Sequence, residues 1–227
     1  MPRKIIVAID GPSGAGKSTV GKRLASELGY LYIDTGAMYR ALGWKALKEG
    51  LDLKEGKALQ DFCARTEVEL KRDGEGLRVI LDGNDVSGLI RTPEMSMAAS
   101  TISAQPCVRE RLLELQRAMG RQGGVVLEGR DIGTVVFPDA HAKFFLDAAV
   151  EERARRRWLE LTDKGNAVTL EQTIEDVKSR DYNDSTRDIA PLKKADDAIV
   201  VDSSGIGIDQ VVGVMKAKVL EIASGDC

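Results

Sequence analysis

The chain has 227 residues, of which 43% are hydrophobic and 30% are charged, the balance of an ordinary globular protein rather than a disordered or membrane chain. Its formal net charge of −3 argues against the extended basic surface that general binding to a nucleic-acid backbone requires. No apolar run approaches the roughly 20 residues of a membrane helix, and Cys63, Cys107 and Cys227 lack metal-ligand spacing. We therefore expect a cytoplasmic protein with free thiols and with neither membrane nor nucleic-acid partners.

The first part of the chain alternates short apolar strands with helices. Residues 4–10 are apolar and β-branched, and residues 17–28 follow with apolar side chains at helical spacing. Residues 31–34 and 37–48 repeat this strand and helix, and a glycine closes each helix. Such alternation predicts a parallel sheet with right-handed crossovers.

The pattern changes between residues 67 and 89. Residues 67–70 and 77–81 alternate apolar with polar side chains, and the sequences at 73–76 and 82–83 are typical of turns. This segment is predicted to be an antiparallel β-hairpin inserted into the α/β pattern.

The second half of the chain returns to strands and helices. We expect helices at 106–119, 151–161, 170–182 and 208–222, and strands at 125–127, 143–146 and 198–202. Together with the two earlier strands, these elements predict an α/β fold in which a five-stranded parallel sheet is flanked by helices.

A complete phosphate-binding loop lies between the first strand and the first helix. Its residues are Gly11, Pro12, Ser13, Gly14, Ala15, Gly16, Lys17 and Ser18. The glycines let backbone N–H groups surround an anion at a helix N-terminus, Lys17 reaches the β- and γ-phosphates, and Ser18 can ligate Mg²⁺. The loop predicts a P-loop nucleoside triphosphate hydrolase fold and a bound nucleoside triphosphate, but it does not identify the reaction.

Acidic residues follow the strand at 125–127, at the carboxyl edge where α/β sheets bind their ligands. Glu128 occupies a Walker-B-like position, from which it is expected to hold Mg²⁺ directly or through water.

Arginines cluster in the next part of the chain. Arg153, Arg155, Arg156 and Arg157 lie within one and a half helical turns, and Arg180 and Arg187 flank a loop. Four arginines on so short a stretch cannot all face one ligand, so Arg155 and Arg156 are equally well explained as solvated surface residues. Arginines that close over a γ-phosphate would neutralise its charge and exclude water, as phosphoryl transfer requires.

Four motifs resemble those of bacterial cytidylate kinases. They are the segment from Ile9 to Ser18, the segment from Asp34 to Arg40, the segment from Gly129 to Ala140, and Arg180-Asp181 with Asp184-Ser185. The resemblance extends over nearly the whole chain, including the hairpin insertion. It implies transfer of the γ-phosphoryl group of MgATP to CMP or dCMP, with ATP bound by residues Gly11 to Thr19 and Mg²⁺ held by Ser18 and Glu128.

The same resemblance implies roles for individual residues. Those expected around the CMP phosphate are Thr35, Tyr39, Arg40, Arg130 and Arg187. Arg180 and Asp184 are expected at the sugar hydroxyls, and Ser100, Arg109 and Asp131 at the cytosine. The residues expected to neutralise the charge of the transferred group are Lys17, Arg130, Arg153 and Arg157. Because cytosine N4 donates a hydrogen bond where uracil O4 accepts one, a carboxylate such as Asp131 favours cytosine.

We expect one compact monomer with three parts. These are a core at 1–34, 101–152 and 185–227, a monophosphate-binding region with the hairpin at 35–100, and an arginine-rich helical lid at 153–184. Two alternatives stay open: another small-molecule P-loop kinase, acting on UMP, dTMP or an alcohol such as shikimate, and a GTPase-like switch. A GTPase would need a guanine-binding Asn-Lys-x-Asp motif, which the sequence lacks.

Overall fold

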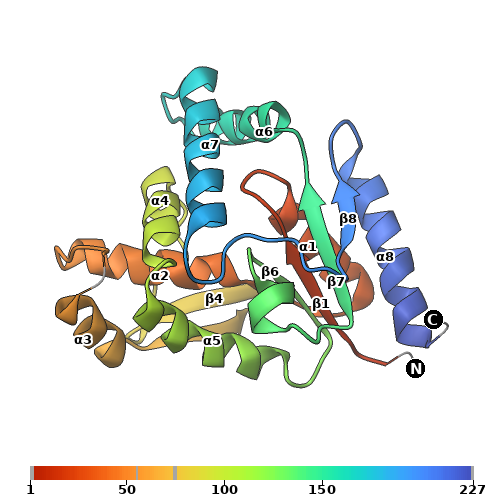
Figure 1. The fold of residues 1–227 in the computed structure, drawn as a ribbon, viewed down its shortest axis with the longest axis horizontal. Coiled ribbons are helices and arrows are strands. Elements are labelled where there is room, and N and C mark those ends of the chain that lie inside the picture. The colour runs from red at the N-terminus through yellow and green to blue at the C-terminus, as the bar shows by residue number, and fades with distance from the viewer. Residues whose placement is uncertain (1–2, 55, 74–75, 226–227) are drawn as a thin grey trace.

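A five-stranded parallel sheet forms the centre of the protein (Figure 1), seen in a computed structural model that describes residues 3–54, 56–73 and 76–225. Its strands are β1 (Ile6–Asp10), β2 (Leu31–Asp34), β6 (Val125–Glu128), β7 (Ala142–Asp147) and β8 (Ile199–Asp202). They lie in the order β2-β6-β1-β7-β8, and each neighbouring pair is parallel. The predicted α/β fold is therefore confirmed.

Helices cover both faces of this sheet. Val7 and Ile9 of β1 belong to the apolar cluster formed with α1 (Lys17–Leu28) and α8 (Ile208–Ser224), whereas Ala8 belongs to a cluster on the opposite face. That second face is covered by the π-helix η1 (Ile132–Val136) and by part of α5 (Pro106–Gly120). Burial on both sides explains why β1 is apolar at successive positions rather than alternating. Ligands consequently have access to the ends of the strands, not to their faces.

The segment between β2 and β6 builds a separate apolar cluster. The elements of this segment, besides α5, are α2 (Thr35–Lys48), α3 (Lys57–Arg65), β3 (Val68–Asp73), β4 (Gly76–Leu81), β5 (Asn84–Asp85) and α4 (Pro93–Ile102). The predicted hairpin is present as β3 and β4, although Gly74 and Glu75 of its turn lie outside the described residues. The short third strand β5 and the helices α3 and α4 are additions to the predicted elements.

Two further helices form a hairpin that rises from the carboxyl end of β7 (Figure 1). They are α6 (Val150–Asp163) and α7 (Leu170–Thr186). Thr169 begins α7 with a capping box, in which its side chain and that of Gln172 each bind the other's backbone N–H. The helix then packs along α6 and against α4, which brings its last turns to the space between α4 and the ends of the sheet strands.

Cys63 and Cys107 are free thiols, as expected, but they are neighbours in space, with Sγ atoms 3.6 Å apart. Burial raises the pKa of the Cys63 thiol to about 12, so this thiol stays protonated at neutral pH. Cys227 lies outside the described residues.

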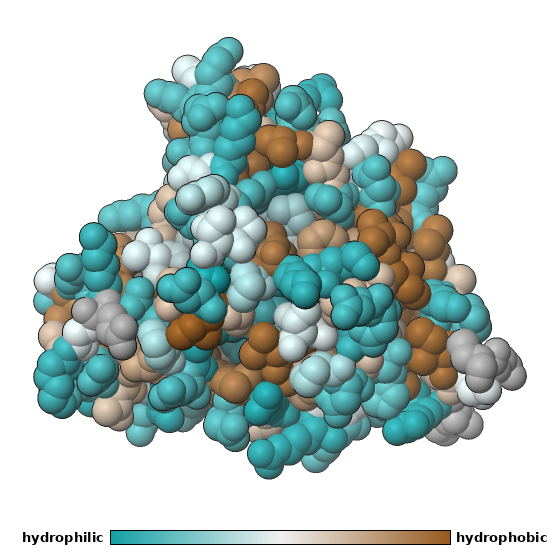
Figure 2. All heavy atoms as spheres, viewed as in Figure 1, coloured by the Kyte–Doolittle hydropathy of each residue, from teal (hydrophilic) through white to brown (hydrophobic). Residues whose placement is uncertain are grey.

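Most of the surface seen in Figure 2 is polar, with scattered apolar groups. The exposed apolar side chains include Val200 of β8 and Val214 of α8. Within the described part of the chain, no helix combines the length and the apolar character needed to cross a membrane.

Candidate active site

A large pocket lies at the carboxyl ends of the parallel strands. Its volume is about 1400 Å³, which exceeds the roughly 300–1,000 Å³ typical of a pocket for one small molecule. The phosphate loop lines one end of it, and Arg109, Asp131 and Arg187 line another part. The pocket is therefore large enough to hold two nucleotide-sized ligands at once.

The phosphate loop is packed tightly between β7 and α6. Gly14 has a φ of 78°, which side chains rarely adopt, and a Cβ atom there would lie 2.8 Å from the carbonyl oxygen of Arg153. A Cβ atom on Gly11 would lie 2.0 Å from the carbonyl oxygen of Leu146. Only glycine fits at either position, and the close packing fixes the path of the loop into α1.

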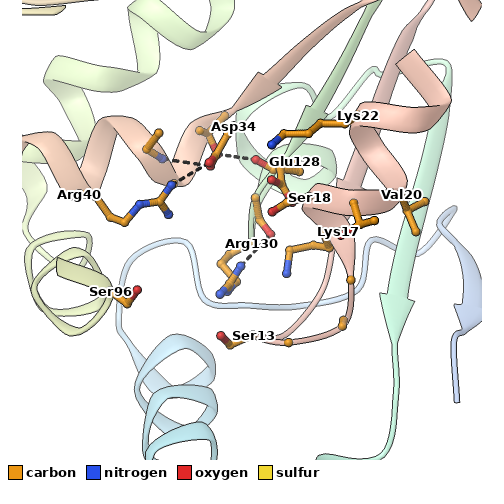
Figure 3. A pocket seen from close by; sticks show the side chains of 18 of the residues that line it. Ser13, Lys17, Ser18, Val20, Lys22, Asp34, Arg40, Ser96, Glu128 and Arg130 are labelled. Atoms are coloured by element: carbon orange, nitrogen blue, oxygen red, sulfur yellow. Dashed lines mark hydrogen bonds and ion pairs between the residues drawn. The ribbon is translucent and has the colours of Figure 1, made fainter. Parts of the chain in front are cut away.

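Lys17 is the first residue of α1 and is buried, with 7% of its surface exposed. Its Nζ donates a hydrogen bond to the carbonyl oxygen of Pro12 at 2.6 Å, and Figure 3 shows it close to Arg130. Burial lowers the pKa of Lys17 to about 7, and repulsion by Arg130 contributes further. An incoming phosphate would therefore strongly stabilise the protonated form of this amine.

Two acidic strand ends lie beside the phosphate loop. Asp34 at the end of β2 is paired in register with Glu128 at the end of β6. Glu128 accepts a hydrogen bond from the hydroxyl of Tyr32 and is 4% exposed. Burial raises the pKa of Glu128 and the charge of Asp34 raises it further, whereas Lys17 lowers it. A nearby cation would relieve this accumulation of negative charge.

The oxygen atoms at this point fit a magnesium ion bound together with a nucleotide. Figure 3 shows the side chains of Ser18 and Glu128 on the same side of the phosphate loop. Mg²⁺ prefers oxygen ligands and commonly uses one or two protein groups, several waters and the substrate phosphates. Among the described residues, no cluster of three or more His, Cys, Asp or Glu side chains is arranged to hold a metal by itself. The donors match a metal that arrives with phosphates.

Asp184, on the last turn of α7, is the centre of a buried charge cluster. Its carboxylate pairs with Arg130 Nε at 2.7 Å, accepts a hydrogen bond from Ser100 Oγ at 2.9 Å, and lies 3.9 Å from Arg180 Nε. Burial alone would raise the pKa of Asp184, but Arg130 and Arg180 outweigh it and hold the value at about 2. The structure thus brings together four predicted site residues from three parts of the chain: α4, the segment after β6, and α7.

Asp131 is the centre of a second buried cluster. Arg109 donates a hydrogen bond to its Oδ2, and Arg187 Nη2 lies 3.7 Å from its Oδ1. Burial raises the pKa of Asp131, and the charges of Arg109 and Arg187 oppose that rise. The guanidinium of Arg109 also lies over the ring of Tyr39, 5.8 Å from its centroid. Four predicted acceptor-binding residues therefore share one end of the pocket.

The start of α2 contributes Thr35 and Arg40. Thr35 Oγ1 donates a hydrogen bond to the carbonyl oxygen of Glu128 at 2.6 Å, and Arg40 Nη2 pairs with Asp34 Oδ2 at 2.7 Å. Nε of Arg40 is buried without a hydrogen-bond partner among the described residues. Figure 3 shows Arg40 on the opposite side of the pocket from Lys17.

The arginines of α6 differ in their surroundings. Arg153 is buried and bonds to the backbone oxygens of Ser13 and Ala148 and to Asp181, so it ties α6 to the phosphate loop and to α7. Arg155 is exposed, in agreement with the surface interpretation.

The next two arginines both line the pocket. Arg156 binds the backbone and side chain of Ser203, and Arg157 pairs with Glu160 at 2.8 Å. Arg156 was predicted no more strongly as a site residue than as a surface residue, yet it faces the pocket.

Three polar residues without a predicted role support the predicted ones. Asp34 pairs with Arg40, Ser103 accepts a hydrogen bond from Arg187, and Asp10 accepts hydrogen bonds from the backbone after Asp131. Asp10 and Asp34 end β-strands at the ligand-binding edge, which is a signal visible in the sequence. Ser103 follows α4, a helix that was not predicted, and no sequence signal marks it.

Solved structures share this fold at low sequence identity. An uncharacterized protein from Eubacterium ventriosum superimposes with a TM-score of 0.52 at 15% identity, covering 96% of this chain and 99% of that one. A gluconokinase from Sinorhizobium meliloti superimposes with a TM-score of 0.50 at 14% identity, covering 99% of this chain and 97% of that one. Similarity at this level supports the fold alone.

Sequence relatives are much closer. A cytidylate kinase of Citrifermentans bemidjiense is 54% identical over 223 residues, covering 98% of this chain and 96% of that protein. A cytidylate kinase of Geobacter sulfurreducens is 53% identical over 219 residues, covering 96% of this chain and 94% of that protein. The cytidylate kinase family profile matches residues 7–221. The phosphate loop and the arginine–aspartate clusters share one pocket. Because the family profile and these relatives span nearly the whole chain, this protein belongs to the cytidylate kinase family.

Proposed function

We propose that the protein transfers the γ-phosphoryl group of ATP to CMP or dCMP, giving ADP and CDP or dCDP. The observation that carries this proposal is the single pocket of about 1400 Å³, with a phosphate loop at one end and the Asp131 cluster at another. Figure 3 shows Arg130 close to Lys17 of the phosphate loop. Family membership supports the same reaction.

At the donor end, we propose that residues 11–19 bind the phosphates of ATP. The helix N-terminus and the turned backbone attract the anion, and Lys17 adds a full positive charge. Ser18 and Glu128 would hold Mg²⁺, which supplies charge neutralisation at the β- and γ-phosphates when bound. Tyr32 restrains the Glu128 carboxylate in place for this task.

At the acceptor end, we propose that charge complementarity binds the monophosphate. Its phosphate would meet the side chains of Thr35, Tyr39, Arg40, Arg130 and Arg187. Arg180 and Asp184 would bind the sugar hydroxyls, and Ser100, Arg109 and Asp131 would read the cytosine. Asp131 can accept the N4 hydrogen of cytosine because its carboxylate is already held by arginines rather than free to turn.

The chemistry then depends on position and charge. The attacking phosphate oxygen of CMP is anionic near neutral pH, so a side-chain general base is unnecessary. We propose that Lys17, Arg130 and the lid residues Arg153 and Arg157 neutralise charge on the transferred group. Arg157 lines the pocket and would contact the transferred group directly. Arg153 would act from its present position, bound to the backbone oxygen of Ser13 in the phosphate loop.

The parts of the chain divide the work in this proposal. The region 35–100 contributes to binding the monophosphate, residues 153–184 form the lid, and the remaining core holds ATP and supplies Arg130 and Asp131 to the acceptor end. We further propose a cytoplasmic monomer, since free thiols such as Cys63 persist in a reducing compartment. Size-exclusion chromatography with light scattering distinguishes a monomer from a dimer.

The direct test identifies the product. The protein is incubated with MgATP labelled in the γ-phosphate and with CMP, and the nucleotides are separated. We expect the label in CDP. Label released only as inorganic phosphate, with CMP unchanged, would indicate an ATPase and contradict the proposal.

Replacing Asp131 by alanine should weaken the binding of CMP far more than the binding of ATP. Loss of a charged hydrogen bond costs about 1.5–3 kcal/mol, which corresponds to roughly a 10- to 150-fold rise in the KM for CMP. Asp131→Asn is the matched variant, because an amide can donate to uracil O4 and should lower the preference for CMP over UMP. Steady-state kinetics with both acceptors measure this, and unchanged values for both would refute the base-reading role of Asp131.

ATP binding at pH 8 should take up a proton. In the nucleotide-free protein the pKa of Lys17 is about 7, so its amine is mostly neutral at pH 8. The phosphates of ATP raise this pKa again, and the amine takes up as much as about one proton per ATP. Calorimetry in two buffers of different ionisation enthalpy measures the uptake, and Lys17→Met should remove it. Uptake that persists in that variant would place the proton elsewhere.

A further inference from the structure

Asp10 ends β1 immediately before the phosphate loop and is 4% exposed. Its two carboxylate oxygens each accept a backbone hydrogen bond: Oδ1 from the N–H of Ile132 at 2.8 Å, and Oδ2 from the N–H of Gly133 at 2.7 Å. Both donors lie in the first turn of η1, where N–H groups have no partner within the helix. Asp10, at the end of β1, therefore caps η1 although it lies 122 residues before Ile132 in the sequence.

The capped turn follows directly on Arg130 and Asp131. The backbone before it is also attached to β1, because the N–H of Gly129 donates to the carbonyl oxygen of Ile9 at 3.0 Å. A Cβ atom on Gly129 would lie 2.7 Å from Ile132 Cδ1, so this turn is closely packed as well. The segment is thus bonded to β1 on both sides of Arg130 and Asp131.

We propose that Asp10 is a positioning residue for the acceptor: its carboxylate fixes the backbone that aims Arg130 and Asp131 into the pocket. This inference rests on the proposed roles of Arg130 and Asp131 in binding CMP. Binding of ATP should depend less on Asp10, because the phosphate loop is separately packed against β7 and α6 through Gly11 and Gly14.

Burial opposes the ionisation of Asp10. Burial raises the pKa of Asp10 to about 6 despite its two backbone donors, Asp131 raises it and Lys17 lowers it. Because the folded protein binds this proton more tightly than the unfolded chain, stability falls as pH rises from about 4 to about 6. At neutral pH the cost of ionising the buried group therefore offsets part of what its two backbone hydrogen bonds contribute.

The test compares Asp10→Asn with Asp10→Ala. Asparagine keeps one acceptor oxygen and alanine keeps none, so the KM for CMP should rise between about tenfold and 10²-fold, with the larger rise in alanine. The KM for ATP should change by less than about threefold. Asp147→Asn is the control, since Asp147 accepts the N–H of Ala148 at the end of β7, outside this segment; it should match the parent.

Hydrogen exchange supplies a readout that is independent of activity. The amides of Ile132 and Gly133 should exchange faster in Asp10→Asn at a nearly unchanged melting temperature. Equal rises in both KM values, or a large loss of stability with unchanged exchange at η1, would overturn the positioning role. If the parent protein itself does not phosphorylate CMP, the proposed function fails instead, and the exchange result still decides whether Asp10 holds the segment.

Discussion

Replacement of Lys17 by alanine is expected to abolish phosphoryl transfer while leaving the protein folded. Lys17 Nζ lies at the phosphate loop, where negative charge develops on the transferred group. Removing one preorganised donor of this kind reduces kcat by about 10²–10³-fold, and the lost charge should reduce it at least that much here. A coupled assay of ADP release measures the effect.

The stability of the variant separates catalysis from folding. Burial lowers the pKa of Lys17 to about 7, so the protonated amine is less favourable in the folded protein than in the unfolded chain. The contribution of Lys17 to the free energy of unfolding consequently decreases as pH falls from about 10 to about 7. Lys17→Met, which keeps the apolar stem, should be inactive yet melt no lower than the parent. The exposed Lys178→Ala is the surface control, and near-parental turnover in folded Lys17→Ala would contradict the mechanism.

Replacement of Asp184 by alanine should reduce both stability and CMP binding. The change leaves the partly buried cations Arg130 and Arg180 without their shared, buried carboxylate. Removing one partner of a buried ion pair typically costs about 3–5 kcal/mol. Chemical denaturation should show this loss, and calorimetric titration should show weaker CMP binding with ATP binding less affected.

Asp184→Asn tests the charge alone, without a cavity. The pKa of Asp184 is lowered from its ordinary value of 3.8 to about 2, which corresponds to about 2 kcal/mol of stability at neutral pH. This contribution is present above about pH 4 and is lost as pH falls towards 2. The asparagine variant should therefore show a flatter decline of unfolding free energy in that range. Asp176→Ala, on an exposed part of the same helix, is the control, and equal losses in both alanine variants would remove Asp184 from the centre of the site.

The sequence predicted the sheet well because its signals are local. The strands are short apolar runs, and the phosphate loop follows one of them at a fixed spacing, so β1 and α1 agree closely with the expected ranges. The helix α2 begins at Thr35, two residues before the expected position, because the Asp34 side chain caps it by accepting the N–H of Ala37. Gly36, the second residue of the helix, obscured this start in the sequence.

The region between β2 and β6 was harder to predict. Phe62 and Leu59 of α3 are fully buried in the apolar cluster that also contains residues of α2 and α5, but the helix has only nine residues, and its apolar positions are few. The helix α4 has a clear start at Thr92 and Pro93, and its small buried residues, such as Ala98 and Ala99, give weak periodicity. These helices form because of tertiary packing, which one sequence does not display.

The pairing within the site was likewise beyond sequence reasoning. The residues were expected to bind substrate, whereas the structure shows which charges hold one another: Asp184 with Arg130, and Asp131 with Arg109. Such pairs join positions more than 20 residues apart, and no local pattern specifies them. The carboxylates of these pairs offset part of the repulsion among the arginines that share the pocket.

Cytosine monophosphates are expected to be the preferred acceptors, and a panel of acceptors decides this. CMP, dCMP, UMP, dTMP, AMP and shikimate are compared at equal concentration with MgATP, by measuring kcat/KM from ADP release. We predict that CMP and dCMP exceed UMP by about tenfold or more, with AMP and shikimate near background. A panel in which UMP, dTMP or shikimate is the best acceptor would contradict the account.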